Sequence, residues 1–107
     1  MNLPPPQATV TVSAPGQISV SSALTFETAR HVYEHGIACF IHDGSPALLV
    51  DCAGVPNADS AGLAVLIEWR RWARQHGRHL QFVNLPAQIN AIAHLSEVSD
   101  VLADAAA

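Results

Sequence analysis

The sequence contains no lysine, and its five basic residues are all arginines, set against nine acidic residues for a formal net charge of −4. Binding to nucleic-acid phosphates requires clustered positive charge. Only Arg70, Arg71, Arg74 and Arg78 lie close together, on one predicted helix and its exit. We therefore expect no direct binding to DNA or RNA, although a partner protein could still handle nucleic acid.

Cysteine and long hydrophobic runs are also scarce. Two isolated cysteines, Cys39 and Cys52, do not make a disulfide framework, and reduced thiols are the expected state. No apolar run approaches the ~18 residues that a membrane-spanning helix needs. The first residues lack the basic end and apolar stretch of a secretory signal. The sequence thus predicts a cytoplasmic protein with no direct membrane insertion.

Common enzyme and metal-site signatures are missing as well. The sequence has no Gly-rich phosphate loop and no Gly-x-Ser-x-Gly elbow, and its acidic residues are scattered. His31 and His35 have the i, i+4 spacing of metal ligands, but no second pair at ligand spacing completes a zinc site. We expect no catalytic residue, cofactor or metal. An acid–base pair whose residues are far apart in the sequence could still be assembled by the fold.

The sequence does contain the material for one globular domain. Half of its 107 residues are hydrophobic and 13% are charged, which suits a single core. Residues 1–8 are proline-rich and predict an extended, flexible tail. Residues 103–107 predict a frayed, flexible end. Residues 9–102 are expected to form the domain between these tails.

Hydrophobic spacing predicts how this domain begins. Apolar residues alternate over residues 9–13 and 17–21, on either side of a Pro-Gly turn, which predicts a β-hairpin. Apolar residues at steps of three or four over residues 26–40, beginning with Phe26, then predict a helix. Thr25 or Ser22 is the expected cap of that helix.

The rest of the domain alternates between strands and helices. The expected elements are a strand over residues 47–50, a helix over 60–75, a strand over 80–83, a helix over 86–95 and a short helix over 98–102. The continuous apolar run of residues 47–50 is typical of a strand covered on both faces. The predicted fold class is α/β: a sandwich with a small central mixed β-sheet and helices packed against it.

The predicted helix over residues 60–75 has more apolar surface than one sheet contact requires. Its apolar residues, Trp69 and Trp72 among them, spread over roughly 220° of its circumference. Packing on a sheet requires a stripe of about 100° or somewhat more. One buried tryptophan is ordinary, because aromatic residues dominate cores. Two together favour a partner surface, so the sequence leaves open whether each is core or interface.

The start of this helix carries the most information. A strand ending at Asp51 leads through a loop to Asp59-Ser60-Ala61-Gly62. Asp59 is a natural N-cap, and Ser60 falls in the first turn, where unpaired N–H groups face outward. Gly62 is expected to leave the surface around Ser60 open. The site is either a simple cap or a contact and switch, since a phosphate on Ser60 would meet the positive helix end.

These residues resemble the hallmark of the STAS domain, the family of sulphate-transporter cytoplasmic domains and anti-sigma-factor antagonists. That hallmark is a buried strand ending in Asp, a loop, and then Asp-Ser-(Ser/Ala/Thr)-Gly-Leu at a helix start. Here it reads Leu48-Leu49-Val50-Asp51 and Asp59-Ser60-Ala61-Gly62-Leu63. The resemblance extends from about Thr9 to Leu102 and implies a STAS-type sandwich.

Within the family, several segments are similar to MlaB-like chains. They are Leu24-Thr25-Phe26 and residues 63–69, 80–89 and 91–98. MlaB-like proteins are the cytoplasmic STAS subunits of an ABC transporter that maintains outer-membrane lipid asymmetry, and they dock on its ATPase. The resemblance therefore implies a subunit that binds and stabilises or regulates a transporter ATPase. Such a protein would be peripheral to the inner membrane through its partner.

The anti-sigma-factor antagonists are the alternative branch. A partner kinase phosphorylates them on the serine that matches Ser60, whereas MlaB-like proteins often carry Thr there. The segment Pro56-Asn57-Ala58 departs from the more apolar approach that is usual in antagonists. In this branch Ser60 is the phosphoacceptor, and an anti-sigma factor kinase is the partner. A third possibility, a stand-alone metal or ligand-binding protein, would bind without any protein partner.

For the partner site, the resemblance implies one contact surface on the outward side of the predicted helix. Its residues are Asp59, Ser60, Ala64, Glu68 and Arg71. Ser60 would be the contact centre, and Glu68 and Arg71 would add polar complementarity at the rim. The residues expected in the core are Leu48, Val50, Leu66 and Phe82.

Overall fold

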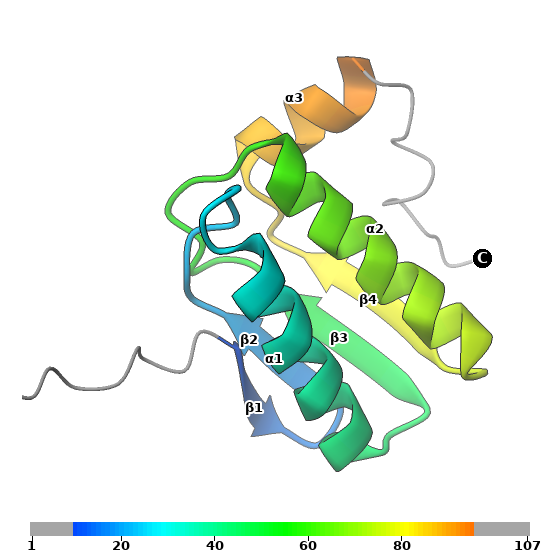
Figure 1. The fold of residues 1–107 in the computed structure, drawn as a ribbon. Coiled ribbons are helices and arrows are strands. Elements are labelled where there is room, and N and C mark those ends of the chain that lie inside the picture. The colour runs from blue at the N-terminus through cyan, green and yellow to red at the C-terminus, as the bar shows by residue number, and fades with distance from the viewer. Residues whose placement is uncertain (1–9, 96–107) are drawn as a thin grey trace, which may run out of the picture.

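The computed structural model describes residues 10–95, which form a four-stranded sheet and three helices (Figure 1). The strands are β1 (Val10–Ala14), β2 (Gln17–Val20), β3 (Ala47–Asp51) and β4 (His79–Val83). The helices are α1 (Ala29–Asp43), α2 (Ser60–Gln75) and α3 (Ala87–Leu95). The predicted α/β architecture is confirmed, and these elements follow one another in the predicted order.

The connections of the sheet place both long helices on one face. β1 and β2 are antiparallel, and the turn between them contains Gly16 with a φ of 74°. β2, β3 and β4 are parallel neighbours in that order. Right-handed crossovers between successive neighbours put the connecting helices on the same side of a sheet. Figure 1 accordingly shows α1 and α2 side by side in front of the sheet, and α3 beside the start of α2.

The core lies between these helices and the sheet. Ile18, Leu48, Val50 and Leu80 are buried strand residues, and Leu66 is fully buried on α2. The predicted core positions Leu48, Val50 and Leu66 are therefore confirmed. Phe82 is only half-buried, and its ring lies 5.3 Å from the Arg70 guanidinium carbon.

The prediction that β3 is covered on both faces is wrong for the part of the chain that the structure describes. Leu49 points to the face opposite the helices and is half-buried, between Gln17 on β2 and Gln81 on β4. None of the helices within residues 10–95 covers this face (Figure 1). An apolar run of only four residues misled the prediction, because a single Leu is tolerated on a polar sheet face.

Helix α1 begins later than the spacing of apolar residues predicted. Its N-cap is Thr28, not Thr25 or Ser22. The Thr28 hydroxyl accepts a hydrogen bond from the Thr25 N–H group at 3.0 Å, which closes a turn before the helix. Phe26 lies in that turn, and its side chain is 81% exposed. The prediction that the helix begins at Phe26 is therefore wrong.

Helices α1 and α2 meet closely at Gly36 and Trp69. A Cβ atom on Gly36 would overlap the indole ring of Trp69, which is completely buried. The indole Nε1 donates a hydrogen bond to the carbonyl oxygen of Tyr33 at 3.1 Å. Trp69 is thus a core residue. Trp72, one turn further, is half-buried and stacks on His76 with ring centroids 4.2 Å apart.

Polar contacts hold the far end of the molecule, where α1 ends. Asp43 accepts hydrogen bonds from the N–H groups of Gly16 and Ser45, both at 2.9 Å. A side-chain hydrogen bond with Ser45, together with these N–H groups, lowers the pKa of Asp43. Arg78 donates from Nε to the Ser45 carbonyl at 2.8 Å and from Nη1 to the Phe40 carbonyl at 2.6 Å. The end of α1, the β1–β2 turn and the approach to β4 are therefore joined.

The last predicted helix, over residues 98–102, lies outside the described residues. The proposed tails, residues 1–8 and 103–107, lie outside them too. These boundaries stay predictions.

Candidate functional site

The candidate site lies at the edge of the sheet where both long helices begin. The loops after β2 and β3 leave the carboxyl ends of parallel strands, which is where α/β sheets commonly bind ligands. Leu24 joins the two loops through its backbone. Its N–H group donates a hydrogen bond to the Asn57 carbonyl at 2.9 Å, and its carbonyl accepts one from the Asp59 N–H group at 3.0 Å. The Leu24 side chain is fully buried, so the joined loops are anchored in the core.

Asp59 caps α2, as predicted, and also holds the other loop. Its Oδ1 accepts hydrogen bonds from the N–H groups of Ala61 at 2.8 Å and Gly62 at 3.1 Å. Its Oδ2 accepts a hydrogen bond from the Phe26 N–H group at 3.0 Å. The Phe26 N–H group first, and then those of Gly62 and Ala61, lower the pKa of Asp59, because hydrogen bonds to a carboxylate favour its charged form. One carboxylate thus connects the start of α2 to the turn that carries Phe26.

This turn, residues 23–28, is also tied internally. The Thr28 hydroxyl donates to the Ala23 carbonyl at 2.6 Å and accepts from the Thr25 N–H group at 3.0 Å. The Thr28 N–H group donates to the Thr25 carbonyl at 3.0 Å. The backbone around Phe26 is therefore fixed from two sides, while its side chain is in solvent.

Gly62 has a different role from the predicted one. It is buried rather than facing the open surface near Ser60. A Cβ atom at this position would overlap the carbonyl group and the Cβ atom of Leu24. Gly62 lets the first turn of α2 pack directly on the backbone of the neighbouring loop, a use of glycine for close approach.

The five predicted contact residues follow one side of α2 and its cap. Ser60, Ala64 and Arg71 are exposed, whereas Asp59 and Glu68 are half-buried. Glu68 and Arg71 form an i, i+3 ion pair with an N–O distance of 3.4 Å and largely exposed side chains. A surface pair of this kind adds little to stability. The side chains of Glu68 and Arg71 are therefore available for polar contacts at the rim of an interface.

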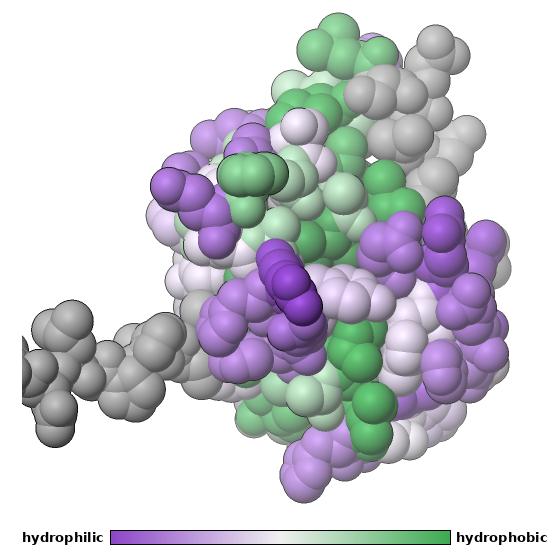
Figure 2. Space-filling view, viewed as in Figure 1, coloured by the Kyte–Doolittle hydropathy of each residue, from purple (hydrophilic) through white to green (hydrophobic). Residues whose placement is uncertain are grey.

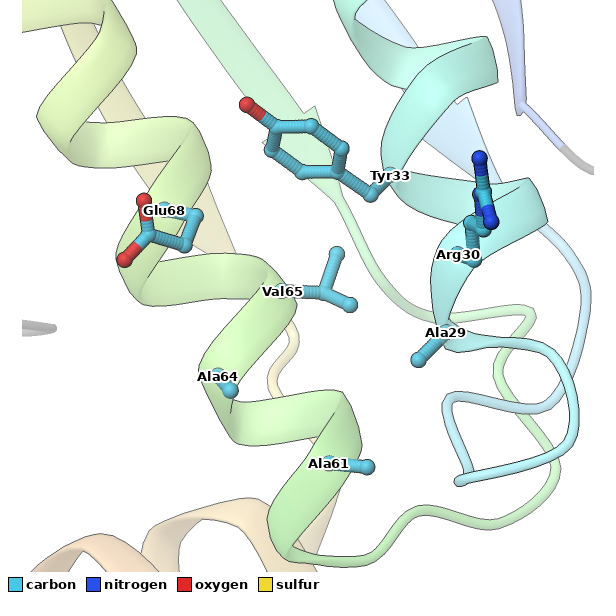
Figure 3. Close-up of a pocket in the computed structure, with 7 residues that line it drawn as sticks. All are labelled: Ala29, Arg30, Tyr33, Ala61, Ala64, Val65 and Glu68. Atoms are coloured by element: carbon cyan, nitrogen blue, oxygen red, sulfur yellow. The ribbon is translucent and has the colours of Figure 1, made fainter.

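An open groove runs between α1 and α2 beside these residues (Figure 3). It has a volume of about 460 Å³. Its lining residues are Ala29, Arg30 and Tyr33 from α1 and Ala61, Ala64, Val65 and Glu68 from α2. Figure 3 shows Tyr33 and Val65 projecting into the space between the helices, with the alanines along its length. The small side chains create a hollow whose floor is apolar and whose borders carry Arg30 and Glu68.

The distribution of side chains on this face of the molecule matches that arrangement. Figure 2 shows hydrophobic side chains on two stretches of the seam between α1 and α2, with hydrophilic side chains between these stretches and on either side. A mostly apolar strip with polar borders is the usual organisation of a protein-binding surface.

Sequence reasoning missed the contribution of α1 to this surface. Tyr33 lies within the helix predicted over residues 26–40, where it is half-buried and lines the groove. The α2 side of the groove contains two predicted residues, Ala64 and Glu68. The apolar surplus of the predicted α2 helix was the signal that pointed to a second contact surface.

The four clustered arginines do not form one basic patch. Arg70 is buried and donates from Nη2 to the Leu80 carbonyl at 2.9 Å, and Arg78 is half-buried against α1. Arg71 and Arg74 are exposed. The burial of Arg70 was not predicted, and it places a guanidinium against the edge strand β4.

Cysteine and histidine side chains offer little reactive chemistry in the described structure. Cys39 and Cys52 are free thiols. Burial mainly, and the charge of Asp51, raise the pKa of Cys52 to about 12, so its thiol is protonated at neutral pH. The His31 and His35 rings lie 4.0 Å apart. Within residues 10–95, no three His, Cys, Asp or Glu side chains are grouped to hold a metal ion.

Of the helices in the described part of the chain, none is both long and apolar enough to span a membrane.

Known proteins similar to this chain were found both by sequence family and by fold. A family model described as "Mlab, STAS domain" matches residues 8–103, nearly the whole chain. Among solved structures, the chain is similar to one described as "a putative anti-sigma factor antagonist" from Thermotoga maritima. The TM-score is 0.69, with 14% sequence identity, over 87% of this chain and 80% of that one. At this identity the likeness concerns the fold alone. The comparison with curated proteins returned no match.

Proposed function

The chain belongs to the STAS-domain family of the Mlab type, and on that premise we propose that it binds the ATPase subunit of an Mla-type phospholipid ABC transporter. Its role there is to stabilise or regulate the ATPase. The contact surface is the start and outward side of α2, centred on Ser60. Binding to this partner would hold the protein in the cytoplasm, at the inner membrane.

One observation carries this proposal: an apolar, open groove lies directly beside an exposed helix start. Ala61, Ala64 and Val65 line the groove, and Ser60 is exposed at the first position of the same helix. The Asp59 carboxylate fixes that helix start through two backbone hydrogen bonds. A preorganised surface loses little conformational freedom on binding, which favours association.

Substitution of Ser60 tests this contact. We expect Ser60→Glu to weaken binding to the purified ATPase subunit by tenfold or more, because a charge buried at a packed contact is costly. Isothermal titration calorimetry measures the affinity. A negative charge at a helix N-terminus favours the helix, so the variant is expected to stay folded. Ser60→Thr, which keeps the hydroxyl group, is expected to bind nearly as well as the wild type.

Gln81→Glu is the matched control. It makes the same change of charge on the sheet face opposite the helices, where Gln81 is exposed. Equal binding by the wild type and by Ser60→Glu would contradict the proposed surface. No binding of the wild-type chain to the ATPase subunit would contradict the proposed partner.

The alternative proposal is an anti-sigma-factor antagonist controlled by phosphorylation of Ser60. The exposure of Ser60 favours it, since a kinase needs access to the hydroxyl group. A phosphate there would lie at the positive end of α2. Incubation with an anti-sigma factor kinase and ATP, followed by mass spectrometry, distinguishes the two. Phosphate on Ser60, absent from Ser60→Ala, together with no ATPase binding, would favour the antagonist.

A further inference from the structure

Phe26 has an exposed aromatic side chain on a backbone that is held by hydrogen bonds. Four large hydrophobic residues within residues 10–95 are exposed, and Phe26 is the aromatic one, with 81% of its surface in solvent. Its N–H group is bound by Asp59, and Thr28 closes the turn around it. The folding of this turn therefore places a phenyl ring in water without offering it a site among residues 10–95. Exposed aromatic residues with ordered backbones are typical anchors of protein interfaces.

A hollow that suits such a ring lies on the same end of the molecule. The groove between α1 and α2 begins at Ala29 and Ala61, which face each other at the starts of the two helices (Figure 3). Phe26 lies three residues before Ala29 and is hydrogen-bonded to the cap of α2. The turn that carries the exposed ring and the apolar hollow are thus neighbours at one end of the molecule.

The charges around the groove are balanced in sign. On α1, Arg30 pairs with Glu34 at 3.3 Å, and on α2, Glu68 pairs with Arg71 at 3.4 Å. A strongly acidic or strongly basic partner gains little from such a face. A second copy of the same face, however, can set Arg against Glu across a two-fold axis, which is how isologous interfaces achieve complementarity.

We propose that this protein forms an isologous homodimer in which Phe26 of each copy occupies the α1–α2 groove of the other. Each aromatic side chain buries roughly 150–250 Å² in such a contact, so the two rings supply about 300–500 Å². Stable interfaces bury about 1,200 Å² or more in total. The dimer is therefore a weak, reversible one. It covers the groove beside Ser60, so it competes with any partner that uses the same face.

This proposal does not depend on the proposed function, because it concerns the full chain alone. Sedimentation equilibrium over a range of micromolar concentrations measures the monomer–dimer equilibrium. We expect the wild type to dimerise, and Phe26→Ala to raise the dissociation constant by at least about tenfold. Ala64→Arg, which fills the groove from an exposed helix position, is expected to do the same. Ile41→Ala is the control, since Ile41 is 64% exposed at the other end of α1.

Mixing the two variants gives the decisive measurement. Phe26→Ala keeps an intact groove, and Ala64→Arg keeps an intact ring, so a mixed dimer regains one of the two contacts. We expect the mixture to dimerise more strongly than either variant alone. A monomeric wild type overturns the proposal, as does a dimer that both variants leave unchanged. Loss of the dimer in each variant without recovery in the mixture also overturns it. If the wild type is monomeric and Phe26→Ala weakens only binding to the ATPase subunit, Phe26 is an anchor for that partner instead.

Discussion

At the residue scale, the Asp59 carboxylate accepts hydrogen bonds from two segments that are far apart in the sequence. Its bonds to Ala61 and Gly62 belong to a helix cap, and its bond to Phe26 crosses 33 positions. These bonds lower the pKa of Asp59. The folded protein therefore holds this group ionised at pH values where the unfolded chain already takes up a proton.

The lower pKa of Asp59 in the folded state sets the direction in which stability depends on pH. An unfolded Asp has a pKa of about 3.9. Between this value and the lower folded pKa, the unfolded state binds more protons, so stability falls as the pH falls. The contribution of Asp59 is complete above pH ~4 and is lost as the pH drops through the folded pKa. Asp43 and Asp51, whose pKa values are also lowered, act in the same direction.

We therefore predict that Asp59→Asn lowers the melting temperature at pH 7 by a few degrees, because Asn can cap the helix but has no second oxygen to accept the Phe26 N–H bond. The difference from the wild type should shrink below pH 4, where the wild-type carboxyl group becomes protonated as well. Thermal unfolding followed by circular dichroism across this pH range measures both. Glu27→Gln, an exposed change of the same charge in the neighbouring turn, is the control. A difference that does not vary with pH would contradict this account.

The cap could be predicted from sequence, but the second role of Asp59 could not. A cap depends on residues within three positions, so Asp59-Ser60-Ala61-Gly62 contains the necessary information. The bond to Phe26 depends on how two loops meet in the folded chain. The same reason explains why Gly62 was misread, since its partner, Leu24, belongs to the other loop.

At the element scale, the pairing of α1 with α2 depends on a glycine in the middle of a helix. Glycine weakens a helix interior by roughly 1 kcal/mol relative to alanine. Gly36 is nevertheless buried, because Trp69 fills the space that a side chain would take. Helix propensity alone gives no reason for a glycine at this position. The reason for the glycine is its contact with Trp69, 33 positions away in the sequence.

We predict that Gly36→Ala destabilises the protein by about 1–3 kcal/mol, although alanine is the better helix former. Overpacking a filled interior has this magnitude, and the gain in helix propensity only partly offsets it. Urea unfolding measures the change. Ala38→Gly, at an exposed position of the same helix, measures the propensity contribution alone. A more stable Gly36→Ala protein would show that Trp69 can move aside without loss.

At the scale of the whole molecule, α2 has a buried side that packs in the core and an opposite, exposed side that carries the proposed contact surface. Leu66 is completely buried against the sheet, whereas Ala64 and Ser60 are exposed. From the helical period, the sequence predicted which residues of α2 are buried and which are exposed. It could not predict the groove, because a groove requires two helices at a particular separation. Nor could it predict the polar outer face of the sheet from an apolar run of four residues.

Because the buried side of α2 is separate from the proposed contact surface, a substitution in the core should change stability and leave binding unchanged. Leu66→Ala should lower the free energy of unfolding by about 2–5 kcal/mol, the range for truncating a buried leucine. The molecules that stay folded should bind the ATPase subunit with unchanged affinity. Urea unfolding measures the free energy of unfolding, and titration calorimetry at low temperature measures the affinity of the same sample for the ATPase subunit. A large loss of affinity in fully folded Leu66→Ala protein would mean that core and surface are coupled.

The two ends of the α1–α2 pair differ in how much variation they can accept. At the end where α1 stops, Asp43 and Arg78 bind backbone atoms of three segments, so a substitution there disturbs several connections together. At the groove end, Ala29, Ala61 and Ala64 line open space. A larger or charged residue could replace the exposed Ala64 without disturbing the core. Substitution there would therefore alter the proposed contact surface, while the opposite end preserves the fold.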